Sequence, residues 1–157
     1  MSIPVATTAA VAATAGTGSI ASGNALSVWY SRLRKPSYQP PKVAFPTVWT
    51  SLYVDIAAAS AVALDRFRAA GQYDKARRYG VALGANLVLN AGWSWLFFRY
   101  HKLGASAVGA AALTVSSADL VRRTAQADRR AAVALSAYPV WCAFATVLAT
   151  HVWRLNR

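Results

Sequence analysis

Aromatic and amide side chains recur at helical spacing in three segments of the chain. Intervals of three, four and seven residues place each set on one face of a helix. The sets are Trp49 and Tyr53; Asn86, Asn90 and Trp93; and Tyr138, Trp141, Cys142 and Ala145. If the three faces converge, they line a flat-walled pocket with a few amide and hydroxyl groups, which suits a large, planar, apolar ligand. The alternative is that these rings fill the core or form an interfacial belt.

Groups suited to acid–base or metal chemistry are sparse. The chain has no glutamate. Asp119 precedes Arg122 and Arg123 by three and four residues, which predicts a local ion pair. Cys142 and His151 share one expected helix but lie about 13 Å apart along its axis, too far to share a metal. We therefore predict no metal site and no required cofactor.

Asp55 differs from the other acids because it interrupts an apolar stretch near its middle. An ionisable group at membrane depth normally faces a partner or a cavity. The functional interpretation is a ligand contact or a proton-linked group. The alternative is a structural hydrogen bond to another helix, or a protonated acid.

The segment 24–43 combines prolines, aromatics and basic residues. Lys35-Pro36 and Pro40-Pro41 fix the backbone and oppose a helix. We interpret this loop as the lid of a binding site. Its aromatic ligand contacts would be Trp29, Tyr30 and Tyr38, and its contacts to a ligand anion would be Arg32, Arg34, Lys35 and Lys42.

The elements that carry these residues are expected to be membrane helices. The chain has 157 residues, of which 56% are hydrophobic, with a net charge of +12 and a mean hydropathy of +0.30. A helix crosses the hydrocarbon core with roughly 20 mainly apolar residues. The pattern predicts one all-α membrane domain over residues 1–157, a five-helix bundle. Its spans would be 3–23, 44–64, 79–98, 103–121 and 131–153.

The alternatives to this architecture are a signal peptide for the first span and a soluble helical bundle for the whole chain. The first span lacks a basic n-region. A soluble bundle would need polar helix faces, and 79–98 and 131–153 have few polar positions. We therefore expect a multi-pass integral membrane protein, in the cell membrane of a bacterium.

The basic residues lie in every segment between spans, close to the span ends. Contact with lipid headgroups explains this distribution better than nucleic-acid binding. Gly80 and Gly84 form a small-residue pair that allows close helix approach. We predict a homodimer contact there, and packing within the chain is the alternative.

Three motifs together resemble the tryptophan-rich sensory protein/translocator protein family, also called peripheral benzodiazepine receptors. The first reads Trp29-Tyr30, Leu33, Lys35-Pro36 and Pro40-Pro41, followed by Trp49 and Tyr53. The second is Leu89-Asn90, Trp93 and Phe97-Phe98. The third is Trp141 with Ala143–Thr146, followed by Val152, Trp153 and Arg154.

The resemblance implies a five-helix membrane bundle, commonly dimeric, with a pocket under the loop between the first two helices. It implies binding of porphyrins such as protoporphyrin IX and haem, and of drug-like ligands such as benzodiazepines. By position, the pocket tryptophans would be Trp49 and Trp141. The residues around them would be Tyr53, Asn90, Trp93, Tyr138, Phe144 and Ala145.

Two departures from the family pattern bear on the ligand. Tyr38 stands where the family usually has Trp, so a ring is kept and a hydroxyl is added. Thr150 stands where the sterol-recognition pattern needs Tyr, which argues against sterol binding by that route.

The leading functional hypothesis is a membrane receptor or carrier for tetrapyrroles, acting in sensing, transport or a stress response. A second is an enzyme in which Trp49 and Trp141 support photo-oxidative degradation of bound protoporphyrin IX. A third is a proton-linked transporter of lipids or small molecules with Asp55 as the coupling group.

Overall fold

The computed structural model describes residues 3–22 and 28–157, and within these residues it is helical, without strands. The expected lid residues 24–27 lie outside the described part, as does residue 23 of the first expected span. The elements are α1 (Ile3–Ser22), α2 (Val28–Arg32), α3 (Ala44–Ala69), α4 (Tyr73–Ser94), the π-helical turn η2 (Trp95–Arg99), α5 (Leu103–Ala125), α6 (Arg129–Leu135) and α7 (Ala137–Leu155).

Four helical segments are long and apolar enough to cross a membrane. They are Ala44–Ala69, Tyr73–Arg99, Leu103–Ala125 and Arg129–Leu155. These match four of the five expected spans but extend past the expected limits, because charged residues continue the helices beyond the apolar stretches. The remaining expected span, 3–23, corresponds to the helix α1, which is not among these four membrane-spanning candidates.

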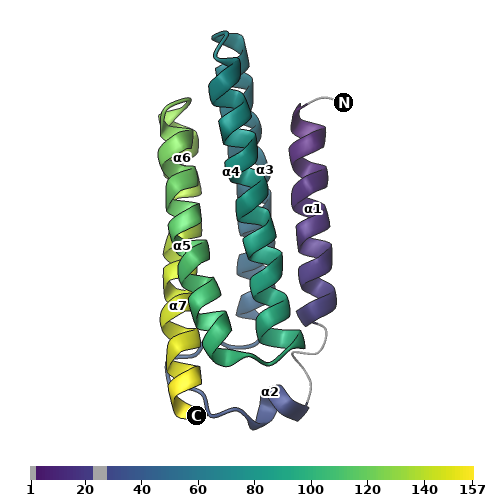
Figure 1. Cartoon of the computed structure of the whole chain (residues 1–157), viewed down its shortest axis with the longest axis vertical. Helices are drawn as coiled ribbons and strands as arrows, with labels where there is room; N and C mark the ends of the chain where they lie inside the picture. Colours follow the sequence, from purple (N-terminus) through teal and green to yellow (C-terminus); the bar gives the residue numbers. More distant parts are fainter. Residues whose placement is uncertain (1–2, 23–27) are drawn as a thin grey trace.

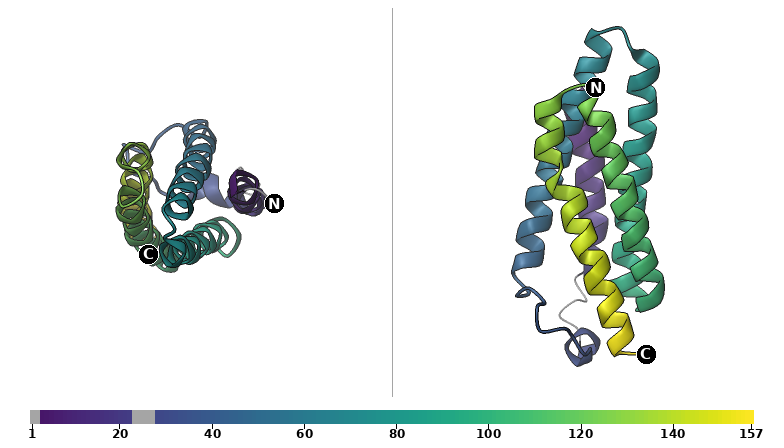
Figure 2. Two further views of the ribbon diagram at one scale, coloured as in Figure 1. Left: turned by 90° about the horizontal axis from the view of Figure 1, so that it is seen from above. Right: turned by 90° about the vertical axis from the view of Figure 1, so that its left-hand side faces the viewer.

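The helices stand side by side as an elongated bundle, with α2 below its lower end (Figure 1). Helix α5 packs along α7 and beside α4, and α1 packs against α3 and α4. Seen from above, α1 lies at the edge of the bundle (Figure 2). The core contains Ile56, Leu120, Leu135 and Tyr138, each fully buried.

Helix α3 changes neighbours along its length. It packs against α6 in the half of the bundle far from α2. In the other half its backbone stands apart from that of α7, which it meets through the ring pairs Phe45–Trp141 and Trp49–Tyr138.

The break between α6 and α7 lies at Ser136, three residues before Pro139. Pro139 has no N–H, and its ring clashes with the carbonyl of residue i−4, Leu135. The proline therefore accounts for the interruption that divides this span into two helices.

Helix α4 ends in the π-helical turn η2, where the N–H of Tyr100 donates to the carbonyl of Trp95 at 2.9 Å. A π turn admits one residue more than an α turn, which rotates the side chains that follow. As a result the successive rings of Phe97 and Phe98 both reach the interior space beside α3.

Candidate functional site

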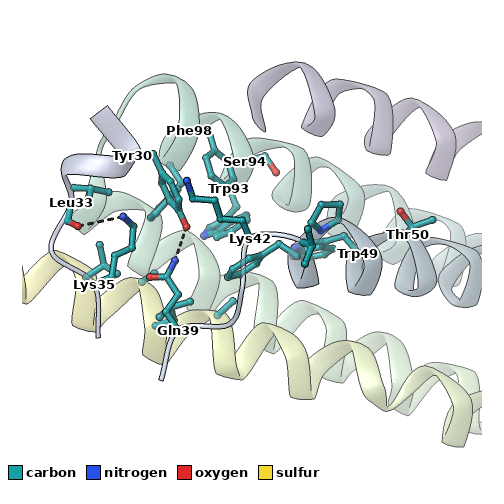
Figure 3. A pocket seen from close by; sticks show the side chains of 18 of the residues that line it. Tyr30, Leu33, Lys35, Gln39, Lys42, Trp49, Thr50, Trp93, Ser94 and Phe98 are labelled. Atoms are coloured by element: carbon teal, nitrogen blue, oxygen red, sulfur yellow. Dashed lines mark hydrogen bonds between the residues drawn. The ribbon is translucent and has the colours of Figure 1, made fainter. Parts of the chain in front are cut away.

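A cavity of about 490 Å³ lies at the α2 end of the bundle, where α3 and α7 are apart. Its walls come from α3, from the end of α4 with η2, and from the second half of α7, and the segment 30–43 covers it. Figure 3 shows the covering side chains Tyr30, Leu33, Lys35 and Gln39 to the left of Trp49. The volume lies in the range of small-molecule sites, roughly 300–1,000 Å³.

Aromatic rings form the walls that α3 and α4 contribute. The Trp49 ring lies 5.7 Å from that of Tyr53 and 6.1 Å from that of Trp93, measured between centroids. The Trp93 ring stacks on Phe97 at 5.9 Å, with 20° between the planes. Helical spacing brings these rings together, because Trp49 and Tyr53 are one turn apart on α3 and Trp93 and Phe97 one turn apart at the end of α4. The result is an apolar surface in which these rings are inclined to their neighbours by 20–33°, with the ring of Phe98 at 84° to that of Trp93.

The cover carries two cations. Lys35 Nζ lies 4.6 Å from the ring centroid of Tyr30, and Lys42 Nζ lies 6.0 Å from it. Lys35 also donates to the carbonyl of Leu33 at 3.4 Å. Burial and the neighbouring charge of Lys42 lower the pKa of Lys35. Among the described residues, neither ammonium has a carboxylate partner, so an anionic group of a ligand would be favoured here.

Hydrogen bonds order the cover. The side-chain amide of Gln39 donates to the Tyr30 hydroxyl at 2.7 Å (Figure 3). Burial raises the pKa of Tyr30, which therefore stays neutral at physiological pH. Both residues line the cavity.

Three contacts attach the cover to the bundle. The Tyr38 hydroxyl is hydrogen-bonded to His151 Nδ1 on α7 at 2.9 Å. The Trp29 ring stacks on His101 at 3.7 Å between centroids. Asn156, just after α7, exchanges two hydrogen bonds with the backbone of Arg34, at 2.9 and 2.8 Å. These contacts hold the cover at Arg34 and Tyr38 and fix the chain at Trp29, just before it.

Behind the aromatic wall, a chain of hydrogen bonds crosses the bundle. The Tyr53 hydroxyl donates to Asn90 Oδ1 at 2.9 Å, and Asn90 Nδ2 donates to the Tyr138 hydroxyl at 3.0 Å. Tyr138 donates to Asn86 Oδ1 at 2.9 Å, and Asn86 Nδ2 donates to Ser116 Oγ at 3.1 Å. Asn86 and Asn90 are 0% and 1% exposed, which confirms that their face of α4 points inward.

The structure divides the expected site residues into those that line the cavity and those that do not. The ones that line it are Tyr30, Lys35, Lys42, Trp49, Tyr53, Trp93 and Ala145. The ones that lie elsewhere among the described residues are Trp29, Arg32, Arg34, Tyr38, Asp55, Asn86, Asn90, Tyr138, Trp141, Cys142 and Phe144.

The second group has identifiable surroundings. Trp141 packs against Phe45 and Phe144, with ring centroids 6.0 and 5.3 Å away. Cys142 is a free, buried thiol in the core. Arg32 and Arg34 are exposed. None of these residues lines the enclosed volume.

Asp55 lies on α3, half-buried, and does not line the cavity. It has no hydrogen-bond or ion-pair partner in the described part of the chain. Asp119 makes the expected ion pairs with Arg122 and Arg123, each at 2.6 Å. No group of three potential metal ligands occurs within residues 3–22 and 28–157.

Two polar atoms of the lining have unused hydrogen-bonding capacity. Within the described residues, the indole N–H of Trp93 and Oε1 of Gln39 are buried without a partner. A buried polar group left unpaired is unfavourable by about 1–3 kcal/mol. A bound molecule with a matching acceptor and donor would remove this penalty.

Sequence reasoning missed part of the lining. On α7, Leu148, Ala149 and Val152 continue the face of Ala145 by three, four and seven residues. The same helical spacing, extended by two turns, would have found them. Phe98 needed knowledge of the π turn, which no sequence pattern indicated. The remaining residues come from α1, the cover and the first turns of α3, with Ser94 on α4; they are Ala15, Leu33, Gln39, Val43, Phe45, Pro46 and Thr50.

The four spans and the covered cavity define a multi-pass integral membrane protein with a ligand-sized internal site. Comparison with known sequences identifies the family within this class of membrane proteins. The chain belongs to the TspO/MBR family, whose sequence model matches residues 5–154.

Individual relatives support this membership. The chain is 29% identical over 148 residues to Protein CrtK of Rhodobacter capsulatus, covering 94% of this chain and 88% of the relative. It is 33% identical over 129 residues to Tryptophan-rich protein TspO of Chlorobaculum tepidum, covering 82% and 79%. It is 32% identical over 131 residues to the human Translocator protein, covering 82% and 75%.

Proposed function

We propose that this protein is a membrane receptor or carrier that binds a tetrapyrrole such as protoporphyrin IX or haem in the covered cavity. The observation that carries the proposal is the pairing of an aromatic wall with two uncompensated lysines at the cover. The wall accommodates a planar macrocycle, and the lysines attract its carboxylates.

The geometry supports a flat amphipathic ligand over a flexible apolar one. The rings of Trp93 and Phe97 are within 20° of parallel, and those of Trp49 and Trp93 within 33°. Such a surface stacks against another flat ring system. A flexible apolar ligand would make no use of Lys35 and Lys42.

Titration of the purified protein with protoporphyrin IX, followed by tryptophan quenching, tests the proposal. Trp49→Phe and Trp93→Phe should each weaken protoporphyrin IX binding about five- to tenfold, because each replaces an indole by a smaller ring and loses part of the aromatic contact. Trp95→Phe is the matched control, because Trp95 is absent from the cavity lining. Equal affinities for all three variants and the unmodified protein would refute the assignment of the cavity.

A second candidate is light-dependent degradation of the bound tetrapyrrole. Its support is that Trp49 lines the cavity, where it would contact a photosensitising ligand. Illumination of the complex should then consume the Soret band, and Trp49→Phe should slow the loss. Loss at the same rate in the variant would exclude a role for this tryptophan.

Helix α1 is proposed as a fifth membrane span. It has 20 residues without a charged side chain, about 30 Å long, and packs along α3 and α4. Single cysteines at Pro4 and at Ser31, an exposed residue of α2 beyond the other end of α1, in a Cys142→Ala background should label from opposite sides of the membrane. Labelling from one side only would place α1 on the surface.

A homodimer contact at Gly80 and Gly84 is likewise proposed. A Cβ added at either glycine would meet no atom within 4 Å, so this part of α4 is open to a partner helix. Gly84→Leu should dissociate a dimer in cross-linking experiments, whereas Gly92→Leu, equally open, is the control. A dimer that survives Gly84→Leu lies on another face.

A further inference from the structure

The hydrogen-bond chain behind the cavity has a fixed direction. An amide oxygen only accepts hydrogen bonds and an amide nitrogen only donates them. Asn90 therefore requires the Tyr53 hydroxyl as its donor, and Asn86 requires the Tyr138 hydroxyl as its donor. The last donor of the chain, Asn86 Nδ2, bonds to Ser116 on α5.

This direction determines what Tyr53 offers to the cavity. Its hydroxyl proton is directed to Asn90, so the oxygen keeps only its accepting capacity. Tyr53 is the lining residue of α3 farthest from the cover, since α3 begins at Ala44 beside the cover. At the deep end of the cavity, the Tyr53 hydroxyl can thus accept a hydrogen bond but has no proton left to donate.

We propose that Tyr53 is a specificity-determining acceptor, and that Asn90, Tyr138, Asn86 and Ser116 are positioning residues that keep it one. The inference rests on the cavity of the proposed function and extends it to a second class of ligand, because protoporphyrin IX with its carboxylates at the cover would turn an edge without N–H or O–H groups toward Tyr53. Ligands of this second class are planar molecules that present an N–H or O–H donor at the edge inserted deepest.

The burial of the positioning residues supports this assignment. Tyr138 and Asn86 are fully buried and Asn90 is 1% exposed, and none of them lines the cavity. Their polar groups hydrogen-bond to one another between α4 and α7. The chain begins at Tyr53 on α3 and ends at Ser116 on α5. They act on a ligand through the orientation of Tyr53, not by contact.

Carbazole and dibenzofuran form a suitable probe pair. They are planar, apolar and nearly equal in size, but carbazole carries an N–H where dibenzofuran carries an oxygen acceptor. Calorimetric titration in nanodiscs, corrected with empty nanodiscs, gives the ratio of the two dissociation constants. The unmodified protein should prefer carbazole about fivefold, the value of one neutral hydrogen bond.

Two variants distinguish the accepting role of Tyr53 from the positioning role of the residues behind it. Tyr53→Phe should bring the ratio close to one while leaving dibenzofuran affinity unchanged. Ser116→Ala removes the final acceptor, so Asn86 loses its fixed orientation, and the ratio should fall at least twofold with dibenzofuran affinity again unchanged. Tyr79→Phe is the matched control, because its hydroxyl belongs to a separate buried group with Ser60 and Thr124.

Each outcome decides the proposal. A ratio unaffected by Tyr53→Phe overturns the acceptor role. A ratio lost in Tyr53→Phe but kept in Ser116→Ala overturns the positioning role. Equal losses of both probes in Ser116→Ala show a purely structural chain, which also overturns it. Failure to bind protoporphyrin IX alongside intact carbazole discrimination would count against the proposed function alone.

Discussion

Asn156 pairs with the backbone of Arg34 through both ends of its side-chain amide. The Arg34 N–H donates to Oδ1 at 2.9 Å, and Nδ2 donates to the Arg34 carbonyl at 2.8 Å. This reproduces the two-bond exchange between paired strands with one side chain. It connects the end of α7 to the cover 122 residues earlier in the sequence.

Asn156→Ala is therefore expected to release bound protoporphyrin IX faster, by about five- to tenfold. The loss of the two exposed hydrogen bonds to Arg34, at about 0.5–1 kcal/mol each, gives this magnitude. The third bond of the side chain, to the Val152 carbonyl at 2.8 Å, lies within the end of α7 and does not reach the cover. Stopped-flow recovery of tryptophan fluorescence measures the dissociation rate. Leu155→Ala, a neighbouring exposed position, should leave the rate unchanged; an equal change in both variants would point to fraying of α7 instead.

Tyr38→Phe should act in the same direction but more weakly. The variant keeps the ring contact with Phe144, at 6.4 Å between centroids, and loses only the hydrogen bond to His151. An increase of about twofold in the dissociation rate is expected. An increase as large as that of Asn156→Ala would mean that the ring of Tyr38 also moves.

The lowered pKa of Lys35 predicts a pH dependence of anion binding. A lysine whose pKa is lowered loses its proton earlier as the pH rises, so carboxylate affinity should decline before the ordinary lysine pKa of about 10.4. Binding measured between pH 7 and 10 should show this decline. In Lys35→Arg the decline should be reduced, because a guanidinium stays charged throughout; identical pH profiles would assign the effect to another group.

A substitution that fills the cavity should reduce ligand affinity without reducing the stability of the fold. Ala145→Phe adds a ring where α7 faces the open volume, so protoporphyrin IX binding should fall at least tenfold while the melting temperature is kept or raised. Ala110→Phe places the same ring in a position that is 2% exposed and has no adjoining volume. That variant should lower the melting temperature by overpacking. Equal destabilisation by both changes would mean that the cavity collapses in solution.

Tyr79→Phe should reduce stability without affecting the site. The Tyr79 hydroxyl bonds to Ser60 at 3.1 Å and to Thr124 at 3.0 Å, at the other end of the bundle from the cavity. Hydrogen bonds between membrane helices contribute about 0.6 kcal/mol each on average, so a loss of about 1 kcal/mol is expected. Unfolding in detergent measures it, and unchanged protoporphyrin IX affinity is the accompanying expectation.

The inward faces of α3 and α4 could be predicted from the sequence for two reasons. An amide side chain that faces lipid is energetically unfavourable, and the regular spacing of a helix then fixes which other residues share the inward face. Asn86 and Asn90 could face only the interior, and that requirement also directed Trp93 inward. The expected spans followed from the length of the apolar stretches. Four of the five expected spans are supported by the length and composition of the helices, and α1 is left as a proposal.

The sequence could not predict which inward residues face the empty volume. Asn90 and Tyr138 share their helix faces with lining residues, yet hydrogen bonds hold them behind Tyr53. Pro139 predicts an interruption of the helix, but not how far α3 and α7 then separate, and the exposure of Phe98 to the cavity depends on a π turn. Helical periodicity encodes neither feature.

The separation of α3 from α7 at the covered end has a thermodynamic consequence. In a packed bundle these helices would bury their facing side chains against each other, whereas here that part of the interior is left unfilled. A bound molecule would complete the hydrophobic core, so folding and binding become linked equilibria. A ligand at one hundred times its Kd would add about 2.7 kcal/mol to the stability of the folded state. Ligand occupancy would therefore make the folded protein more resistant to unfolding in the membrane.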